Sequence, residues 1–320
     1  MWIGFVVARA ASMDATWTTV SLASEALTQG HSVAFIEPWD WEVDPRRRVV
    51  VRAHIFESGR ALDNEAIVRA LQSGTAPRRL LQIGILGVLM LRVAPYRSDV
   101  MSLGALARDQ GVPVVNDPDG MTRVAHKGWL AAQKQVRTPR SVVTRSRASA
   151  HLFYRTCPAG VVCKPARGSG GRGVCFVPPK ALHQLDAALD SSIRHGVGHV
   201  VVQEYLEEAR FGEKRLVWFD GELLGGYLRR RGTDAFHHNL KQGGVAEATE
   251  LTDADRKAVK GLSKPLLEAG IRLAGLDVIG DYVTEVNALN PGGLYFTDLL
   301  SKSQHTATVV AGLTQPNGIL

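Results

Sequence analysis

Residues 161–174 (VVCKPARGSGGRGV) constrain the fold most strongly, because they begin as an apolar strand and continue into a glycine-rich loop. Glycine lacks a Cβ, so such a loop can fold close against an anion and point backbone N–H groups at it. The loop carries Gly168, Ser169, Gly170, Gly171 and Gly173, and the cations beside it are Lys164, Arg167 and Arg172. The stretch predicts a hairpin whose loop binds the phosphates of a nucleotide; a plain hairpin turn is the alternative.

Two common phosphate-binding motifs are absent from this stretch. No Gly-Lys-Ser/Thr sequence opens a helix here, which excludes the loop of P-loop NTPases. Gly168, Gly170 and Gly173 fit the spacing G-x-G-x-x-G, but no βαβ unit with a ribose-binding acid follows. A nucleotide bound by this loop therefore requires a different fold.

The chain has 320 residues, of which 45% are hydrophobic and 22% charged, and its formal net charge is +7. This composition is typical of a globular protein with two or three subdomains, and the positive charge suits an anionic small molecule. Aromatic residues make up 7% and are not interleaved with the basic ones, so nucleic acid is not expected as a partner. Cys157, Cys163 and Cys175 lack the spacing of a zinc site or a disulfide framework.

Neither of the apolar stretches is expected to enter a membrane. Residues 1–14 lack the basic start of a signal peptide and fit a first strand better. Residues 80–94 contain Gln82 and Arg92 and are too short to span a bilayer. We therefore expect a cytoplasmic protein without a membrane partner.

Strands and helices alternate over residues 1–118, which predicts a parallel-sheet domain. The strands are expected at 2–8, 31–37, 87–93 and 112–117, and the helices at 14–29, 64–72 and 98–110. Residues 40–60 fit a mixture of short strands and turns.

After residue 118 the pattern predicts hairpins separated by helices. Strands are expected at 141–146, 161–165, 199–208, 215–219 and 222–228, and a further hairpin at 275–280 and 282–287. Helices are expected to begin near 149 and to cover 180–194, 252–269 and 297–312. Asp220-Gly221 is the strongest short hairpin signal of the chain. Residues 232–244 are polar and bounded by glycine, so they are expected to form a mobile loop.

Three oxygen-bearing side chains of the 275–287 hairpin predict a metal site. Glu285 and Asn287 are two residues apart on a strand and therefore share a face. A three-residue loop puts Asp277 directly opposite Glu285, whereas a two-residue turn puts it on the other face. We expect the three-residue loop, because it gathers oxygen ligands of the kind that Mg²⁺ prefers. A sheet face with ordinary polar residues is the alternative.

Two weaker signals fit a nucleotide as well. The apolar strand that ends in Gln203–Leu206 can offer backbone groups to an adenine edge, although any buried strand end looks similar. Basic side chains suit phosphates and a developing oxyanion, although each one alone fits a solvated surface charge. They are Lys127, Lys164, Lys214, Arg215, Arg229 and Arg230.

The order of these motifs resembles the bacterial glutathione synthetases of the ATP-grasp superfamily. The likeness rests on Lys127, KPARGSGGRGV, VQEYL, FGEKR, NLKQGG, LTDADR and GLDVIGDYVTEVN, and covers nearly all of residues 85–291. It implies an α/β ATP-grasp fold with an N-terminal parallel-sheet (pre-ATP-grasp) domain at 1–118, a central ATP-grasp subdomain at 119–202 and a C-terminal α+β domain at 203–320. It also implies ATP, two Mg²⁺ ions for which Mn²⁺ can substitute, and a homo-dimer or homo-tetramer.

The resemblance implies a role for each matching residue. The ATP contacts are Lys127, Lys164, Gly168, Ser169, Gly170, Gly171, Gly173, Gln203, Glu204, Tyr205 and Leu206, with Glu213 on the ribose. Arg215, Arg229 or Arg230, and a backbone N–H of Gly292 or Gly293 stabilise the oxyanion. Asp277, Glu285 and Asn287 hold the metal, while Arg92 and Asn290 help to hold the acid substrate.

The sequence departs from the family pattern where the acid and the amine bind. Ala94-Pro95-Tyr96 replaces paired prolines, and His237-His238 stand near an expected arginine. The turn NALNPGG (287–293) is closer to D-alanine–D-alanine ligases and to glutamate-adding ligases. We expect an ATP-dependent carboxylate–amine ligase that works through an acyl phosphate on small-molecule substrates, with γ-glutamylcysteine and glycine as the leading pair. The alternatives are a ligase of a dedicated pathway for another acid and amine, and a nucleotide-binding protein without catalysis.

Overall fold

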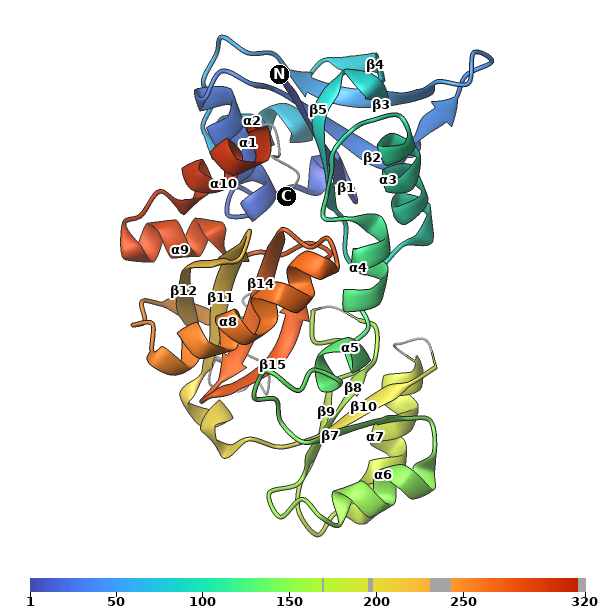
Figure 1. Ribbon diagram of the computed structural model, residues 1–320, viewed down its shortest axis with the longest axis vertical. Coiled ribbons are helices and arrows are strands. Elements are labelled where there is room, and N and C mark those ends of the chain that lie inside the picture. Colours follow the sequence, from blue (N-terminus) through green and yellow to red (C-terminus); the bar gives the residue numbers. More distant parts are fainter. Residues whose placement is uncertain (169, 195–197, 231–242, 316–320) are drawn as a thin grey trace. The chain divides into compact units, whose positions relative to one another are not determined.

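The computed structural model describes residues 1–168, 170–194, 198–230 and 243–315 (Figure 1). The chain divides into two compact units, of which the first comprises Met1–Met121, Leu267–Leu273 and Ala288–Leu320 and the second comprises Thr122–Leu266 and Ala274–Asn287. The segments 267–273 and 288–315, which the sequence suggests belong to a C-terminal domain, thus pack with the N-terminal residues. A boundary near residue 202 stays a prediction.

The first unit is built around one sheet with the strand order β4-β3-β2-β1-β5-β6 among its described residues. Strand β1 pairs in parallel with both β2 and β5, β5 pairs in parallel with β6, and β3 and β4 are antiparallel. The elements are β1 (Trp2–Val7), η1 (Ala10–Ser12), α1 (Thr18–Thr28), β2 (Ser32–Val43), β3 (Val49–Phe56), α2 (Asn64–Gln72), β4 (Arg78–Gln82), η2 (Ile83–Ile85), β5 (Leu86–Arg92), α3 (Ser98–Asp109), β6 (Val114–Val115), α4 (Pro118–Val124), α9 (Leu294–Ser301) and α10 (His305–Thr314).

Most of the predicted elements of this unit are present. The parallel strands are continuous apolar runs, as expected of strands that are covered on both faces. The first helix begins at Thr18 rather than at residue 14, because Asp14 accepts the backbone N–H of Thr16 and forms a turn there. Residues 40–60 are not a set of short elements, since β2 and β3 form one long hairpin.

The second unit contains two sheets, with the strand orders β7-β10-β8-β9 and β13-β12-β11-β14-β15 among its described residues. Its elements are α5 (Gly128–Ala131), β7 (Ser141–Thr144), α6 (Arg147–Tyr154), β8 (Val161–Pro165), β9 (Cys175–Val177), α7 (Leu182–Arg194), β10 (Val200–Glu204), η3 (Glu207–Phe211), β11 (Glu213–Phe219), β12 (Glu222–Arg230), β13 (Val245–Glu247), α8 (Asp253–Glu268), β14 (Leu273–Ile279) and β15 (Tyr282–Asn287). The predicted hairpin across Asp220-Gly221 is present, with both turn residues at positive φ.

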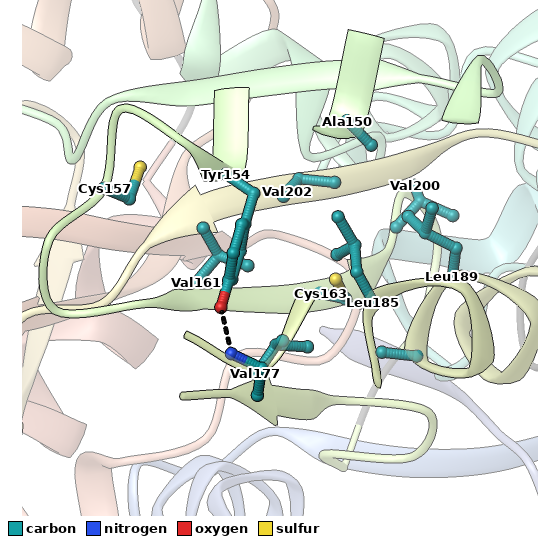
Figure 2. Packing of buried hydrophobic residues seen from close by; sticks show 12 residues of the cluster. Ala150, Tyr154, Cys157, Val161, Cys163, Val177, Leu185, Leu189, Val200 and Val202 are labelled. Atoms are coloured by element: carbon teal, nitrogen blue, oxygen red, sulfur yellow. Dashed lines mark hydrogen bonds between the residues drawn. The ribbon is translucent and has the colours of Figure 1, made fainter. Parts of the chain in front are cut away.

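An apolar core fixes the strand that enters the glycine-rich loop (Figure 2). Strand β8 alternates between buried and partly buried residues, so Val161 and Cys163 pack against α6 and α7 while Val162 and Lys164 face the opposite side. The hydroxyl of Tyr154 donates to the carbonyl oxygen of Pro178 at 2.6 Å, so this buried polar group is satisfied. Lys164 is thus held on a rigid strand, on the face away from this core.

Candidate active site

The β14–β15 hairpin brings Asp277 directly opposite Glu285, as expected, but by a different route from the one predicted. The turn has two residues, because Ile279 pairs with Tyr282, so the predicted three-residue loop is wrong. The register shifts by one residue between Asp277 and Val278, which leaves Thr284 as the extra residue of a β-bulge. Because of this bulge Asp277 lies opposite Glu285, which a regular hairpin with a two-residue turn would not allow.

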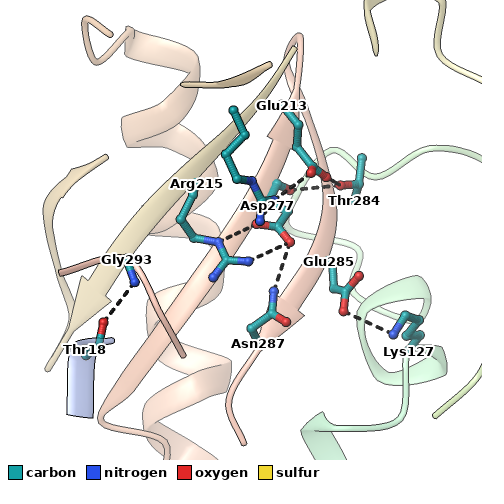
Figure 3. Close-up of polar contacts among 10 residues, drawn as sticks. Thr18, Lys127, Glu213, Arg215, Asp277, Thr284, Glu285, Asn287 and Gly293 are labelled. Atoms are coloured by element: carbon teal, nitrogen blue, oxygen red, sulfur yellow. Dashed lines mark hydrogen bonds and ion pairs between the residues drawn. The ribbon is translucent and has the colours of Figure 1, made fainter. Parts of the chain in front are cut away.

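Asp277 is buried and paired with two guanidinium groups (Figure 3). Its Oδ1 accepts from Arg215 Nε at 2.6 Å and lies 2.7 Å from Arg229 Nη2, while its Oδ2 accepts from Arg215 Nη2 at 3.2 Å and from Asn287 Nδ2 at 3.0 Å. Burial opposes the charged carboxylate, but the two guanidinium groups outweigh it and lower the pKa of Asp277 to about 2. Asp277 is therefore a fixed negative charge.

Two lysines from other parts of the second unit donate hydrogen bonds to the β14–β15 hairpin. Lys127 Nζ donates to Glu285 Oε1 at 3.1 Å and to the carbonyl oxygen of Gly168 at 3.2 Å, so it connects the β14–β15 hairpin to the glycine-rich loop. Lys164 Nζ donates to the carbonyl oxygen of Thr284 at 3.4 Å. Burial lowers the pKa of Lys164, and the nearby Lys127 acts in the same direction.

One pocket of the second unit collects most of the residues predicted to bind ATP and metal. It is lined by Val162, Lys164, Gly170, Gly171, Val174, Gln203, Glu204, Tyr205, Leu206, Ala209, Glu213, Arg215, Arg229, Asp277, Ile279, Thr284, Glu285 and Asn287. The lining thus combines apolar side chains with charged ones. Such a combination suits an aromatic base with a phosphate chain.

The glycine-rich loop adopts the backbone conformation that explains its composition. Gly170, Gly171 and Gly173 all have a positive φ, a backbone angle that residues with a Cβ rarely adopt. Gly170 and Gly171 line the pocket, whereas the carbonyl oxygen of Gly173 accepts from Ser192. Ser169 lies outside the described residues, as does nearly all of the predicted 232–244 loop, including His237 and His238.

The two alternatives for the second arginine differ sharply in their surroundings. Arg229 is buried, and its Nη2 lies 2.6 Å from Glu213 Oε2. The neighbouring carboxylates strongly raise the pKa of Arg229 against the opposing effect of burial. Arg230 is exposed and pairs with Glu247 at 2.6 Å, away from the pocket lining. The geometry favours Arg229.

The predicted metal ligands offer the oxygen donors that magnesium prefers. Two carboxylates and one amide oxygen are hard donors, and all three side chains line one pocket. Among the described residues no group of three His, Cys, Asp or Glu side chains is arranged around a metal position, so the set of Asp277, Glu285 and Asn287 stays a prediction. Asp277 would share its oxygens with Arg215 and Arg229.

The predicted residues of the first unit lie around the 289–293 turn. Arg92 is buried and donates to the carbonyl oxygen of Pro291 at 2.8 Å, so it contacts the turn itself. The N–H of Gly293 donates to Thr18 Oγ1 at 3.0 Å (Figure 3). This N–H group, one of the two that the resemblance offers to the oxyanion, is thus already hydrogen-bonded. Gly292 and Asn290 are partly exposed.

Sequence reasoning missed Thr284 and Thr18. Thr284 Oγ1 donates to the carbonyl oxygen of Asp277 at 3.2 Å and lies 3.3 Å from Glu213 Oε1, so it joins the β14–β15 hairpin to β11. Neither threonine stands in a motif that marks it. Only the bulge and the long-range contacts reveal their positions.

Residues 130–300 match the model of the prokaryotic glutathione synthetase ATP-grasp domain. The glutathione synthetase of Synechococcus elongatus is 31% identical over 308 residues, which cover 94% of each chain, and that of Gloeobacter violaceus is 31% identical over 301 residues, which cover 88% of this chain and 87% of that protein. This chain belongs to the prokaryotic glutathione synthetase family. It is an ATP-dependent, ADP-forming ligase with the ATP-grasp fold.

Solved structures agree on the fold. The D-cycloserine synthetase DcsG superposes with a TM-score of 0.67 at 15% identity and covers 97% of this chain and 98% of its own. The VanG D-Ala:D-Ser ligase from Enterococcus faecalis superposes with a TM-score of 0.66 at 13% identity and covers 98% of this chain and 99% of its own. At these identities the likeness establishes the ATP-grasp fold that the sequence predicted, and no substrate.

ATP-grasp ligases of this family use ATP with Mg²⁺ and act on small molecules. Among the described residues, no helix has both the length and the apolar character needed to cross a bilayer.

Proposed function

We propose that this chain forms a peptide bond between γ-glutamylcysteine and glycine at the expense of ATP. The observation that carries the proposal is the pocket in which Lys164 and the Asp277–Arg215–Arg229 cluster converge with Glu285, which also accepts from Lys127. The curated relatives that are 31% identical over nearly the whole chain are glutathione synthetases, which supports this substrate pair.

The reaction has two steps in this proposal. The carboxylate of the acid attacks the γ-phosphorus of ATP, which releases ADP and leaves an acyl phosphate. The amine then attacks the acyl carbon, and inorganic phosphate leaves as the amide forms. Arg215 and Arg229 would stabilise the oxyanion of the second step, where loss of one donor costs about 3–4 kcal/mol.

Each remaining site residue has a role in the proposal. Lys127, Lys164 and the glycine-rich loop would bind the phosphates, Gln203–Leu206 the adenine and Glu213 the ribose. Asp277, Glu285 and Asn287 would hold two Mg²⁺ ions, or Mn²⁺ in their place, which neutralise phosphate charge. The chain would act as a cytoplasmic homo-dimer or homo-tetramer.

A ligase for a different acid and amine is the second candidate. The observation in its favour is that the departures from the family pattern, at Ala94–Tyr96 and at 287–293, fall where the acid and the amine are expected. A nucleotide-binding protein without catalysis is disfavoured, since both lysines and all the predicted metal ligands are present.

The first prediction is that ADP release with Mg²⁺ and ATP is fastest with γ-glutamylcysteine and glycine. The measurement is a coupled ADP assay that scans γ-glutamyl acids and free amino acids against a panel of amines, with product mass by mass spectrometry. Release of ADP only with another acid and amine would establish the second candidate function. Absence of ADP and of any amide product across the panel, with ATP still bound, would contradict ligase activity toward these substrate classes.

A further inference from the structure

Lys127 reaches its partners in the second unit from the short segment that precedes α5. Its Nζ donates to Glu285 Oε1 at 3.1 Å (Figure 3) and to the carbonyl oxygen of Gly168 at 3.2 Å. Its backbone N–H donates to the carbonyl oxygen of Ala166 at 2.8 Å, so the same residue is bonded to the chain that leads into the glycine-rich loop. The position of the ammonium group therefore depends on how the backbone of residues 126–128 is held.

The imidazole of His126 holds this backbone. Its Nδ1 accepts the N–H of Gly128 at 3.1 Å, which closes a small turn around Lys127. Nδ1 of histidine stands at the same place along the side chain as the Oδ1 of asparagine, which bonds the N–H two residues ahead in the same way. The N–H of Trp129 donates to the carbonyl oxygen of His126 at 2.7 Å. His126 thus supports the start of α5 through both its side chain and its backbone.

Gly128 leaves room for the ring of His126. A Cβ added at Gly128 would lie 2.8 Å from Nδ1 and 3.0 Å from Cε1 of His126, which is closer than carbon atoms of this kind normally approach. The φ of Gly128 is not positive, so its backbone conformation does not itself require glycine. The close approach of the imidazole therefore accounts for the glycine at this position.

Among the described residues, the charged groups that act on the ring of His126 are all basic. Arg167 follows β8, Lys127 is the next residue of the chain, and the ring of His199 lies 6.2 Å away between centroids in an edge-to-face arrangement. Burial lowers the pKa of His126 below its ordinary value of 6.5, and these basic neighbours act in the same direction. The imidazole is therefore neutral at neutral pH, so that Nδ1 can accept a hydrogen bond.

We infer that His126 is a positioning residue, which holds Lys127 toward the nucleotide phosphates through Gly128 and releases it when the imidazole takes up a proton. A protonated Nδ1 carries a hydrogen and cannot accept the N–H of Gly128. The cationic ring also repels Lys127. Binding of ATP is thus coupled to pH through a side chain that does not line the pocket. The inference rests on the proposed role of Lys127 in binding the phosphates.

The test compares His126→Leu, which removes the acceptor, with His126→Asn, which keeps an acceptor at the same place without a titratable ring. His183→Asn is the matched control, because it makes the same change at an exposed residue of α7 that does not line the pocket. Lys127→Met measures the contribution of Lys127 itself.

The measurement is the dissociation constant of ATP with saturating Mg²⁺ and no acid substrate, determined by titration calorimetry between about pH 5 and pH 8. Circular dichroism confirms at each pH that the variants are folded. Dissociation constants are compared as ratios at the same pH, so that the titration of ATP itself cancels.

Lys127→Met is expected to weaken ATP binding by about 10- to 100-fold, which corresponds to the loss of a hydrogen bond to a charged group. His126→Leu should lose about tenfold at neutral pH, since nothing then holds the turn. His126→Asn should bind like the wild type at about pH 8. Below pH 6.5 the wild type should lose affinity relative to His126→Asn, because only the wild type takes up a proton at this position. His183→Asn should follow the wild type throughout.

His126→Leu with the affinity of the wild type would overturn the inference, as would equal losses in His126→Leu and His126→Asn, because the ring rather than its hydrogen bond would then matter. A constant ratio between the wild type and His126→Asn down to about pH 5 would overturn the release by protonation. Unchanged affinity in Lys127→Met refutes the proposed role of Lys127. A loss in Lys127→Met without one in His126→Leu refutes only this inference, so the two failures are distinguishable.

Discussion

Replacement of Asp277 by asparagine is expected to lower the free energy of unfolding by about 3–5 kcal/mol, which is the cost of leaving buried charges without their partner. Asp277 is 5% exposed and lies within 2.7 Å of both Arg215 and Arg229. Asparagine has nearly the same shape, so packing should survive. Glu213 would still pair with Arg229, but Arg215 would lose its charged partner in this cluster. Urea denaturation of both proteins without ATP measures the difference.

Asp281→Asn is the matched control, since it makes the same chemical change in the turn of the same hairpin. Asp281 lies 3.4 Å from Arg137, and both side chains are about 60% exposed. Exposed ion pairs contribute roughly 0–1 kcal/mol, so this variant should unfold at nearly the wild-type urea concentration. Equal stability losses in the two variants would contradict the buried-cluster explanation.

The same cluster predicts a pH dependence. The folded-state pKa of Asp277 is about 2, below the ordinary aspartate value of 3.8. A depressed pKa means that the stabilisation is complete above the unfolded-state pKa and is lost as the pH falls through the folded-state pKa. The stability gap between the wild type and Asp277→Asn should therefore be constant above about pH 5 and narrow between about pH 4 and pH 2.

Local signals explain which parts of this molecule could be predicted from the sequence. The turn at Asp220-Gly221 and the start of α8 are encoded within a few residues, because glycine adopts positive φ and Thr252 caps the helix by accepting the N–H of Asp255. The glycine-rich loop is similar, since its backbone conformation requires the glycines that mark it. These features were found at the predicted positions.

Features that depend on distant residues could not be predicted in this way. The bulge at Thr284 is a one-residue change of register, and the hydrogen bond of its hydroxyl toward Glu213 joins residues 71 positions apart. The segments 267–273 and 288–315 belong to the first unit, where the side chain of Asn116 bonds backbone groups of Leu273 and Ala288. No local pattern identifies such partners before the fold brings them together.

Glu285→Gln is expected to lower the rate of ADP formation by about 10²–10³-fold, the loss typical when one preorganised electrostatic group is removed from an active site. Glu285 is the predicted metal ligand that also accepts from Lys127, at 3.1 Å. Glutamine keeps the size of the side chain and an oxygen for Lys127, but it removes the negative charge that a divalent cation would need. The stability should change by less than about 1 kcal/mol, because the side chain is partly exposed.

The dependence on magnesium separates a metal ligand from a residue that only orients Lys127. If Glu285 holds Mg²⁺, the variant should require a higher Mg²⁺ concentration for half-maximal activity, and excess Mg²⁺ should restore part of the rate. Glu222→Gln serves as the control, because Glu222 is an exposed residue of β12 in the same sheet and does not line the pocket. Turnover by Glu285→Gln at the wild-type rate, or a loss with an unchanged Mg²⁺ requirement, would contradict the assignment of Glu285 as a metal ligand.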